Sequence, residues 1–259
     1  MAPLLLATLA LAMAAVCTAA ALPPSAEGSR IVGGVEAKLG ELPSTVALIE
    51  GGQRSGGGIL IGPKLVLTAA HCAYNTSMDF KIRAGALKWN ESGILVNVSR
   101  YLLYPEYNIN GYNHDIALLY LAEEVSESPT ISYAKLLKRE SDPTAKSKVT
   151  TAGWGRIAID EEASVTLRRV TVSVVDRSTC RAAYQKLNLP VTENMVCAAE
   201  PGKDSCSGDS GGPLYDDATK DLVGVVSWGF QCAEPGFPGV YVRVGKYIEW
   251  IAKNNKAPQ

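Results

Sequence analysis

The sequence predicts an all-β fold with few helices. Short apolar or β-branched runs alternate with turn residues along both halves of the chain, and 24 glycines and 14 prolines are available for the turns. Many short strands at this spacing are typical of barrels and sandwiches. The expected strands are 45–49, 59–61, 65–68, 94–98 and 116–121 in the first half, and 148–152, 166–175, 222–228 and 240–244 in the second.

Two helices and one connection complete the expected organisation. Asp176 is a favourable N-cap for a short helix that runs to Leu187. A second helix is predicted at the end of the chain, because apolar residues recur there at helical spacing. Its apolar face consists of Val244, Tyr247, Ile248 and Ile251. Segment 126–145 has no clear periodicity and is the expected connection between the two halves.

The composition is that of a globular protein that begins with a leader. Hydrophobic residues make up 47% of the 259, charged residues 20%, and the net charge is −1, so nothing resembles a nucleic-acid or anionic-membrane binder. An uncharged alanine- and leucine-rich run predicts a secretory signal over residues 1–21. The alternative, an uncleaved membrane anchor, requires a longer span. Secretion would permit disulfides and glycosylation at Asn75, Asn90 and Asn97.

Ser210 is the candidate nucleophile, because glycines flank it in the segment 204–213. A serine in such a tight turn exposes its hydroxyl, while the N–H groups of Gly208 and Ser210 point at one position, as an oxyanion hole requires. The segment also matches the nucleophile elbow of α/β-hydrolases. In those enzymes the histidine follows the serine, whereas His71 and His114 both precede it here. This order excludes that fold and argues against an esterase.

A base and an orienting acid, which a serine hydroxyl needs, are both found upstream. His71 follows a predicted strand, and Asp115 stands at the head of a very apolar strand, where a carboxylate would be partly buried. The separations are 44 residues (115 − 71) and 95 residues (210 − 115). His114 lacks such support, and we expect it to be an exposed neighbour of the acid.

The order His71, Asp115, Ser210 and the motifs around them resemble the chymotrypsin-like serine proteases, in particular the trypsin-like subgroup. The similarity covers nearly all of the mature chain, residues 31–259. It implies two six-stranded antiparallel β-barrels with a short intermediate helix and a C-terminal helix. The first barrel, about 31–135, would carry His71 and Asp115, and the second, about 136–259, Ser210.

The resemblance implies a role for each matching position. Ser210 would attack the peptide carbonyl, His71 would take its proton and later donate it to the leaving amine, and Asp115 would hold the imidazole. Ser227 resembles the family's serine beside the acid. Its strand, with Trp228, is expected to pair with the substrate backbone.

The resemblance also implies cleavage after arginine or lysine. Asp204 lies six residues before the candidate nucleophile and, with Ser205 beside it, resembles the acid at the foot of the trypsin specificity pocket. Gly229 and Gly239 match the glycines that keep the pocket walls open. Gln231 departs from the trypsin pattern, which usually has a glycine at this rim, so the preference between arginine and lysine stays open.

Residues around position 30 resemble the activation site of a protease zymogen. The resemblance implies a propeptide over 22–30 and cleavage between Arg30 and Ile31, after which the new amino group of Ile31 would pair with Asp209. A buried pair of this kind works as a switch. Arg30 itself fits the expected specificity, so our hypothesis is that the zymogen activates itself.

The cysteines do not all pair. Cys17 leaves with the signal, so five of the six remain and one is odd. By resemblance, the pairs are Cys180 with Cys197 and Cys206 with Cys232. Cys72 is left over, because the position 16 residues upstream that usually supplies its partner is Gly56. We therefore expect a free, largely buried thiol next to His71.

No cofactor or metal is expected. The sequence has no His-Glu-x-x-His and no paired Cys-x-x-Cys motif, and the loop after Gly85 lacks most of the carboxylates that calcium would need. The expected partners are protein substrates and proteinaceous inhibitors, and a monomer is expected. The alternative function is a secreted noncatalytic homologue that binds its targets. Such proteins usually lose a triad residue, whereas all three are present here.

Overall fold

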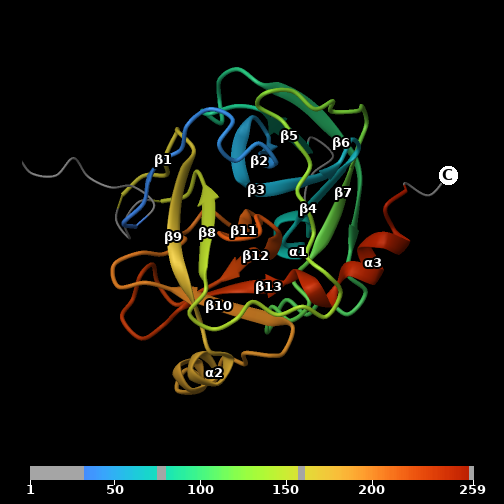
Figure 1. Ribbon diagram of the computed structural model, residues 1–259. Coiled ribbons are helices and arrows are strands. Elements are labelled where there is room, and N and C mark those ends of the chain that lie inside the picture. Colours follow the sequence, from blue (N-terminus) through green and yellow to red (C-terminus); the bar gives the residue numbers. More distant parts are fainter. Residues whose placement is uncertain (1–31, 75–79, 157–160, 257–259) are drawn as a thin grey trace, which may run out of the picture.

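The computed structural model describes residues 32–74, 80–156 and 161–256 (Figure 1). Within these residues the strands form two closed antiparallel barrels, which confirms the predicted fold class. The first barrel has the order β2-β3-β4-β7-β6-β5. Its strands are β2 (Thr45–Glu50), β3 (Gln53–Gly62), β4 (Leu65–Thr68), β5 (Phe80–Ala84), β6 (Ile94–Leu103) and β7 (Ala117–Leu121).

The second barrel has the order β9-β10-β13-β12-β11-β8 and is closed by pairing between β8 and β9. Its strands are β8 (Lys148–Gly153), β9 (Arg168–Val175), β10 (Met195–Ala199), β11 (Pro213–Asp216), β12 (Leu222–Trp228) and β13 (Gly239–Arg243). Residues 122–147 contain no strand longer than an isolated bridge. The expected connection over 126–145 therefore lies between the barrels.

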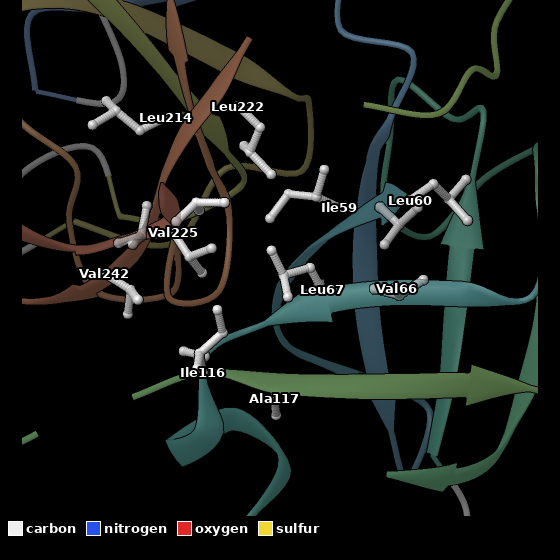
Figure 2. Close-up of a cluster of buried hydrophobic side chains, with 14 of the residues drawn as sticks. Ile59, Leu60, Val66, Leu67, Ile116, Ala117, Leu214, Leu222, Val225 and Val242 are labelled. Atoms are coloured by element: carbon white, nitrogen blue, oxygen red, sulfur yellow. The ribbon is translucent and has the colours of Figure 1, made fainter. Parts of the chain in front are cut away.

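Apolar side chains of both barrels form one continuous core. Figure 2 shows Ile59 and Leu67 of the first barrel beside Val225 of the second, and all three are fully buried. Burying an aliphatic side chain of this size contributes about 1.5–3 kcal/mol. Because the shared core fixes one barrel against the other, residues on the two sides of the interface keep a defined relative position.

The start of the described chain lies on the second barrel. Strand β1 (Val35–Glu36) pairs with β9, and the carbonyl of Val32 accepts a hydrogen bond from the N–H of Asp204 at 3.2 Å. The sequence-based division near residue 135 assigns this segment to the first barrel, but its hydrogen bonds are made with the second.

The end of the chain returns to the first barrel. The predicted terminal helix is split into a 3₁₀ turn, η1 (Val244–Lys246), and α3 (Ile248–Lys253). The hydroxyl of Tyr120 in β7 donates to the carbonyl of Asn254 at 2.8 Å, and α3 lies beside this barrel in Figure 1. Each end of the described residues therefore contacts the barrel that is farther away in sequence: β1 pairs with the second barrel and Asn254 contacts the first.

Two further helices are α1 (Ala70–Ala73) and α2 (Arg177–Gln185). The Asp176 carboxylate caps α2 by accepting hydrogen bonds from the N–H groups of Ser178 and Thr179, as predicted. The helix ends at Gln185, two residues before the expected end. In the described part of the chain, no helix combines the length and apolarity needed to cross a membrane.

Candidate active site

Strand pairing brings His71 and Asp115 together although they are 44 residues apart in sequence. His71 lies in α1 just after β4, Asp115 lies just before β7, and β4 and β7 are neighbours with Thr68 opposite Ala117. His71 Nδ1 is 2.7 Å from Asp115 Oδ2, and the His71 N–H donates to Asp115 Oδ1 at 2.8 Å. The Asp115 side chain is fully buried, so the imidazole is held by an acid that water does not reach.

The second barrel contributes a further hydrogen bond to this acid. Ser227 in β12 donates its hydroxyl to Asp115 Oδ2 at 2.5 Å. Burial alone would lower the pKa of His71, but the hydrogen bond and charge of Asp115, together with contact with Cys72, raise it well above its ordinary value. This environment therefore stabilises the protonated imidazole once the ring has accepted a proton.

Ser210 sits in a tight turn of the second barrel. It lines a cavity of about 290 Å³ together with His71, Ser227 and Trp228. Its carbonyl accepts a hydrogen bond from the N–H of Gly57 at 2.8 Å, which ties the turn to the first barrel. His71 and Ser210 therefore line one cavity, although they come from different barrels.

The turn contains two N–H groups that take no part in its own hydrogen bonds, if only the described residues are counted. Among the described residues, the N–H groups of Gly208 and Ser210 have no hydrogen-bond partner. Gly208 has φ +96°, a conformation that other residues rarely adopt. Two unpaired N–H groups in a fixed turn suit the stabilisation of a negatively charged oxygen.

A second cavity of about 170 Å³ opens beside Ser210 and has Asp204 in its wall. Asp204 is only 3% exposed. Its Oδ2 accepts a hydrogen bond from Ala233 N–H at 3.1 Å, whereas its Oδ1 has no partner in the described ranges. Burial raises the pKa of Asp204 to about 7, against the backbone hydrogen bonds that lower it. The wall of the cavity therefore contains a buried carboxyl group, and among the described residues no basic side chain pairs with it.

Other predicted residues form the walls of this second cavity. Ser205, Trp228, Gly229, Gln231 and Gly239 all line it. A Cβ atom on Gly239 would lie 2.6 Å from Asp204 Oδ1, so a larger residue would press on the carboxylate. Gln231 has φ +57°, in the left-handed region that favours glycine.

Asp209 is buried directly behind the turn. Its carboxylate accepts hydrogen bonds from the N–H of Gly155 at 2.7 Å and of Cys206 at 2.9 Å. Burial raises the pKa of Asp209 to about 6, while these N–H groups and the charge of Arg54 oppose the shift. Its expected partner, Ile31, and the cleavage residue Arg30 lie outside the described residues.

The cysteines are arranged as the resemblance implies. Disulfides join Cys180 to Cys197 and Cys206 to Cys232, and Cys72 is free and buried. A Cβ atom built on Gly56 would lie 3.3 Å from the Cys72 sulfur. The thiol therefore faces the glycine that stands where a partner cysteine was expected.

His114 was expected to be exposed, and this prediction was wrong. Its ring stacks on Tyr104 with centroids 4.9 Å apart, its Nδ1 is 3.1 Å from the Tyr247 hydroxyl, and only 16% of its side chain is exposed. The cause is the terminal segment, whose tyrosine covers the ring.

Two of the three predicted glycosylation positions lie on the surface. Asn90 and Asn97 are exposed, as a glycosylated residue must be, and Asn75 lies outside the described residues. Over the described ranges, no group of three potential metal-binding side chains comes together.

Several residues of the site carry no motif and were not predicted. Tyr112 meets the His71 ring edge-on at 5.8 Å and lines the same cavity with Leu189 and Pro190. The Tyr184 hydroxyl donates to the Pro238 carbonyl at 2.7 Å and supports the loop that forms the pocket wall. Of these, only Tyr112 could have been suspected from the sequence, because it lies three residues before the acid.

The chain is similar in sequence to known proteins. A family model described as Trypsin matches residues 31–251. The chain is 42% identical over 230 residues to Trypsin Blo t 3 from Blomia tropicalis, which covers 85% of this chain and 84% of the relative. It is 38% identical over 255 residues to a trypsin from Phaedon cochleariae (94% and 96% covered). It is 37% identical over 236 residues to Hypodermin-B from Hypoderma lineatum (90% of each).

Proposed function

Because the chain belongs to the trypsin family of serine endopeptidases, we propose that it cleaves proteins after arginine or lysine with His71, Asp115 and Ser210 as its catalytic residues. The observation that carries the specificity is the buried Asp204 carboxyl with one unpaired oxygen, in a cavity that opens at Ser210. A buried charge left without a partner costs about 2–5 kcal/mol. A basic side chain would remove that penalty.

The hydrogen bonds around His71 support the proposed chemistry. Its Nδ1 is engaged by Asp115, so Nε2 is the nitrogen available to the serine. Ser210 Oγ attacks the peptide carbonyl carbon as its proton passes to Nε2. The carbonyl oxygen becomes an oxyanion that the N–H groups of Gly208 and Ser210 stabilise. Nε2 then protonates the leaving amine and the C–N bond breaks, which gives an acyl-enzyme that water hydrolyses by the same steps.

The proposal includes synthesis as a secreted zymogen, with a signal over 1–21 and a propeptide over 22–30. Cleavage after Arg30 would free the Ile31 amino group to pair with Asp209. The position of Val32 against the Asp204 loop supports this, since it brings the start of the described chain to the same barrel as the buried Asp209.

If the zymogen activates itself, purified Ser210→Ala zymogen will not convert to an Ile31 terminus. Conversion of that variant without added protease would refute self-activation.

The decisive experiment compares two amide substrates that differ only in the residue before the cleaved bond. The processed enzyme should hydrolyse an arginyl amide and leave an aromatic amide nearly untouched, and a serine-reactive reagent should abolish the activity. The Ser210→Ala variant is the matched control. Preference for the aromatic amide would overturn the assigned specificity. Binding of protein targets without hydrolysis of either substrate would favour the noncatalytic alternative.

A further inference from the structure

Arg54 reaches from the first barrel to the turn that carries Ser210. It lies in β3 and is half-buried, and its Nη1 donates a hydrogen bond to the carbonyl of Gly208, 154 residues away in sequence. A Cβ atom on Gly208 would lie 2.7 Å from its Nη2. The guanidinium therefore lies directly against the glycine whose N–H is free.

Two peptide groups flank the Gly208 Cα, and the carbonyl oxygen of each accepts a hydrogen bond. The Ser207 carbonyl accepts a hydrogen bond from the Arg156 N–H at 2.8 Å, and the Gly208 carbonyl accepts the one from Arg54. Glycine has two soft dihedrals and little steric restriction. The Gly208 N–H shares its plane with the Ser207 carbonyl, which Arg156 holds. The second plane is held at both ends, because the Asp209 N–H donates to the Cys206 carbonyl at 2.9 Å and Arg54 donates to the Gly208 carbonyl. Arg54 therefore restrains the direction of the Gly208 N–H through the plane that follows the Gly208 Cα.

Arg54 also acts on the buried acid behind the turn. Its positive charge opposes the rise that burial causes in the pKa of Asp209, and Asp209 in return raises the pKa of Arg54 against its own burial. The same guanidinium thus restrains the carbonyl of residue 208 and favours the charged form of residue 209. One side chain therefore stabilises both the position of the Gly208 carbonyl and the charge of the Asp209 carboxylate.

We propose that Arg54 is a positioning residue for the oxyanion-binding turn: from the first barrel it clamps the Gly208 carbonyl and so aims the Gly208 N–H at the reacting carbonyl. The inference rests on the proposed function, because it assigns that N–H to the oxyanion. It adds a side chain from outside the catalytic motifs to the machinery of the reaction. Loss of this clamp affects the transition state and leaves the Asp204 pocket intact.

The test compares two inhibitors of the processed enzyme. Benzamidine, an aromatic amidinium, places a cation at Asp204 and forms no oxyanion. A peptide aldehyde ending in arginine places the same charge there, and addition of Ser210 Oγ to its carbonyl carbon also creates a tetrahedral oxygen at Gly208. For Arg54→Ala we expect kcat on an arginyl amide to fall by about 10- to 100-fold, with the aldehyde weakened by a similar factor. KM and the benzamidine inhibition constant should change by less than about twofold.

Conservative and control variants separate positioning from folding. Arg54→Lys, which keeps a donor and the charge, should recover most of the loss. If Arg54→Ala does not fold, Arg54→Met, which keeps an unbranched side chain without donors, carries the same test. Arg83→Ala is the matched control, because Arg83 is also half-buried in the first barrel and also donates to a loop carbonyl, that of Ser92. It should alter none of these constants by more than about twofold.

Two results would overturn the inference: a kcat for Arg54→Ala within about twofold of the parent, or equal losses of benzamidine and aldehyde affinity. Failure of the proposed function is a separate result. It would appear as an absence of arginyl amidase activity in the parent enzyme, before any variant is compared.

Discussion

The two barrels position their residues of the candidate active site by different means. His71 and Asp115 lie at the ends of the neighbouring strands β4 and β7, whose side chains are buried, and the cysteine beside them is free. Ser210 and Asp204 lie in a loop that is held by left-handed glycines, a disulfide and the buried Asp209. Strand pairing is enough to fix the base and acid, whereas the nucleophile's loop needs covalent and electrostatic bracing.

Neutralising the acid should give the largest effect, because an amide at this position keeps the contact with His71 but removes the charge and favours the wrong tautomer of the ring. For Asp115→Asn we expect kcat to fall by about 10⁴-fold, as in trypsin itself. His71 must be unprotonated to accept the serine proton, and Asp115 raises its pKa. The rising limb of the pH profile should therefore move to lower pH. A loss below about tenfold, measured as kcat against pH, would contradict the assigned role.

Both disulfides of the second barrel should support its stability, but only one of them should also support binding at the Asp204 pocket. They close loops of 17 and 26 residues, so removing either by paired Cys→Ala changes should cost about 3 kcal/mol of unfolding free energy. Cys206 and Cys232 both line the Asp204 cavity, whereas Cys180 and Cys197 do not. Only loss of the former pair should also weaken benzamidine binding. Equal weakening in both double variants would show that the bracing is not local.

A disulfide added to the first barrel should stabilise it without improving catalysis. In a disulfide, the Cβ of one cysteine lies about 3 Å from the sulfur of the other, and a Cβ on Gly56 would lie 3.3 Å from the Cys72 sulfur. Gly56→Cys would close a loop of 16 residues (72 − 56) and add up to about 3 kcal/mol. The Ser210 carbonyl is only 2.9 Å from that Cβ and belongs to the backbone, so the turn must shift and the shift subtracts from the gain in stability.

Thermal unfolding with and without reductant measures this gain, and Gly56→Cys combined with Cys72→Ala is the control. A rise in kcat of more than about fivefold would mean that strand pairing alone does not fix the base.

The smallest predicted effect is a pH dependence of cation binding in the second barrel. Burial raises the pKa of Asp204 to about 7 in the empty pocket. Benzamidine stays charged over this range, so it should bind about tenfold more weakly at pH 6 than at pH 8 as the carboxylate takes up a proton. Inhibition constants across this range provide the measurement. A flat profile would place Asp204 out of contact with the cation.

Strands could be predicted from the sequence where their own apolar side chains determine the structure. Leu65–Thr68 and Leu222–Trp228 are apolar runs and form strands within the predicted limits. The glycine-rich first half of β3 was not predicted, because glycine has no side chain to pack. Its path is set by pairing with β2 and by a distant contact, the hydrogen bond from Gly57 N–H to the Ser210 carbonyl. The strand β11 was also missed, since it begins with Pro213, which cannot donate to the ladder.

The same distinction applies to the site. His71, Asp115, Ser210 and Asp204 stand in motifs, and so their positions could be predicted from spacing and resemblance. Arg54 could not, because its role depends on a contact across two barrels that no local pattern encodes. The burial of His114 could not be predicted either, because it depends on contact with Tyr247, 133 residues later in the sequence.

The central claim is that both barrels bring their reactive groups to one cleft beside the Asp204 pocket. Reaction of the processed enzyme with a phosphonate ester that carries an arginine-like side chain, followed by peptide mapping, tests it directly. We predict a single covalent adduct on Ser210 that is absent from His71→Ala and blocked by benzamidine. An adduct on another residue, or equal labelling by an aromatic phosphonate, would contradict the account.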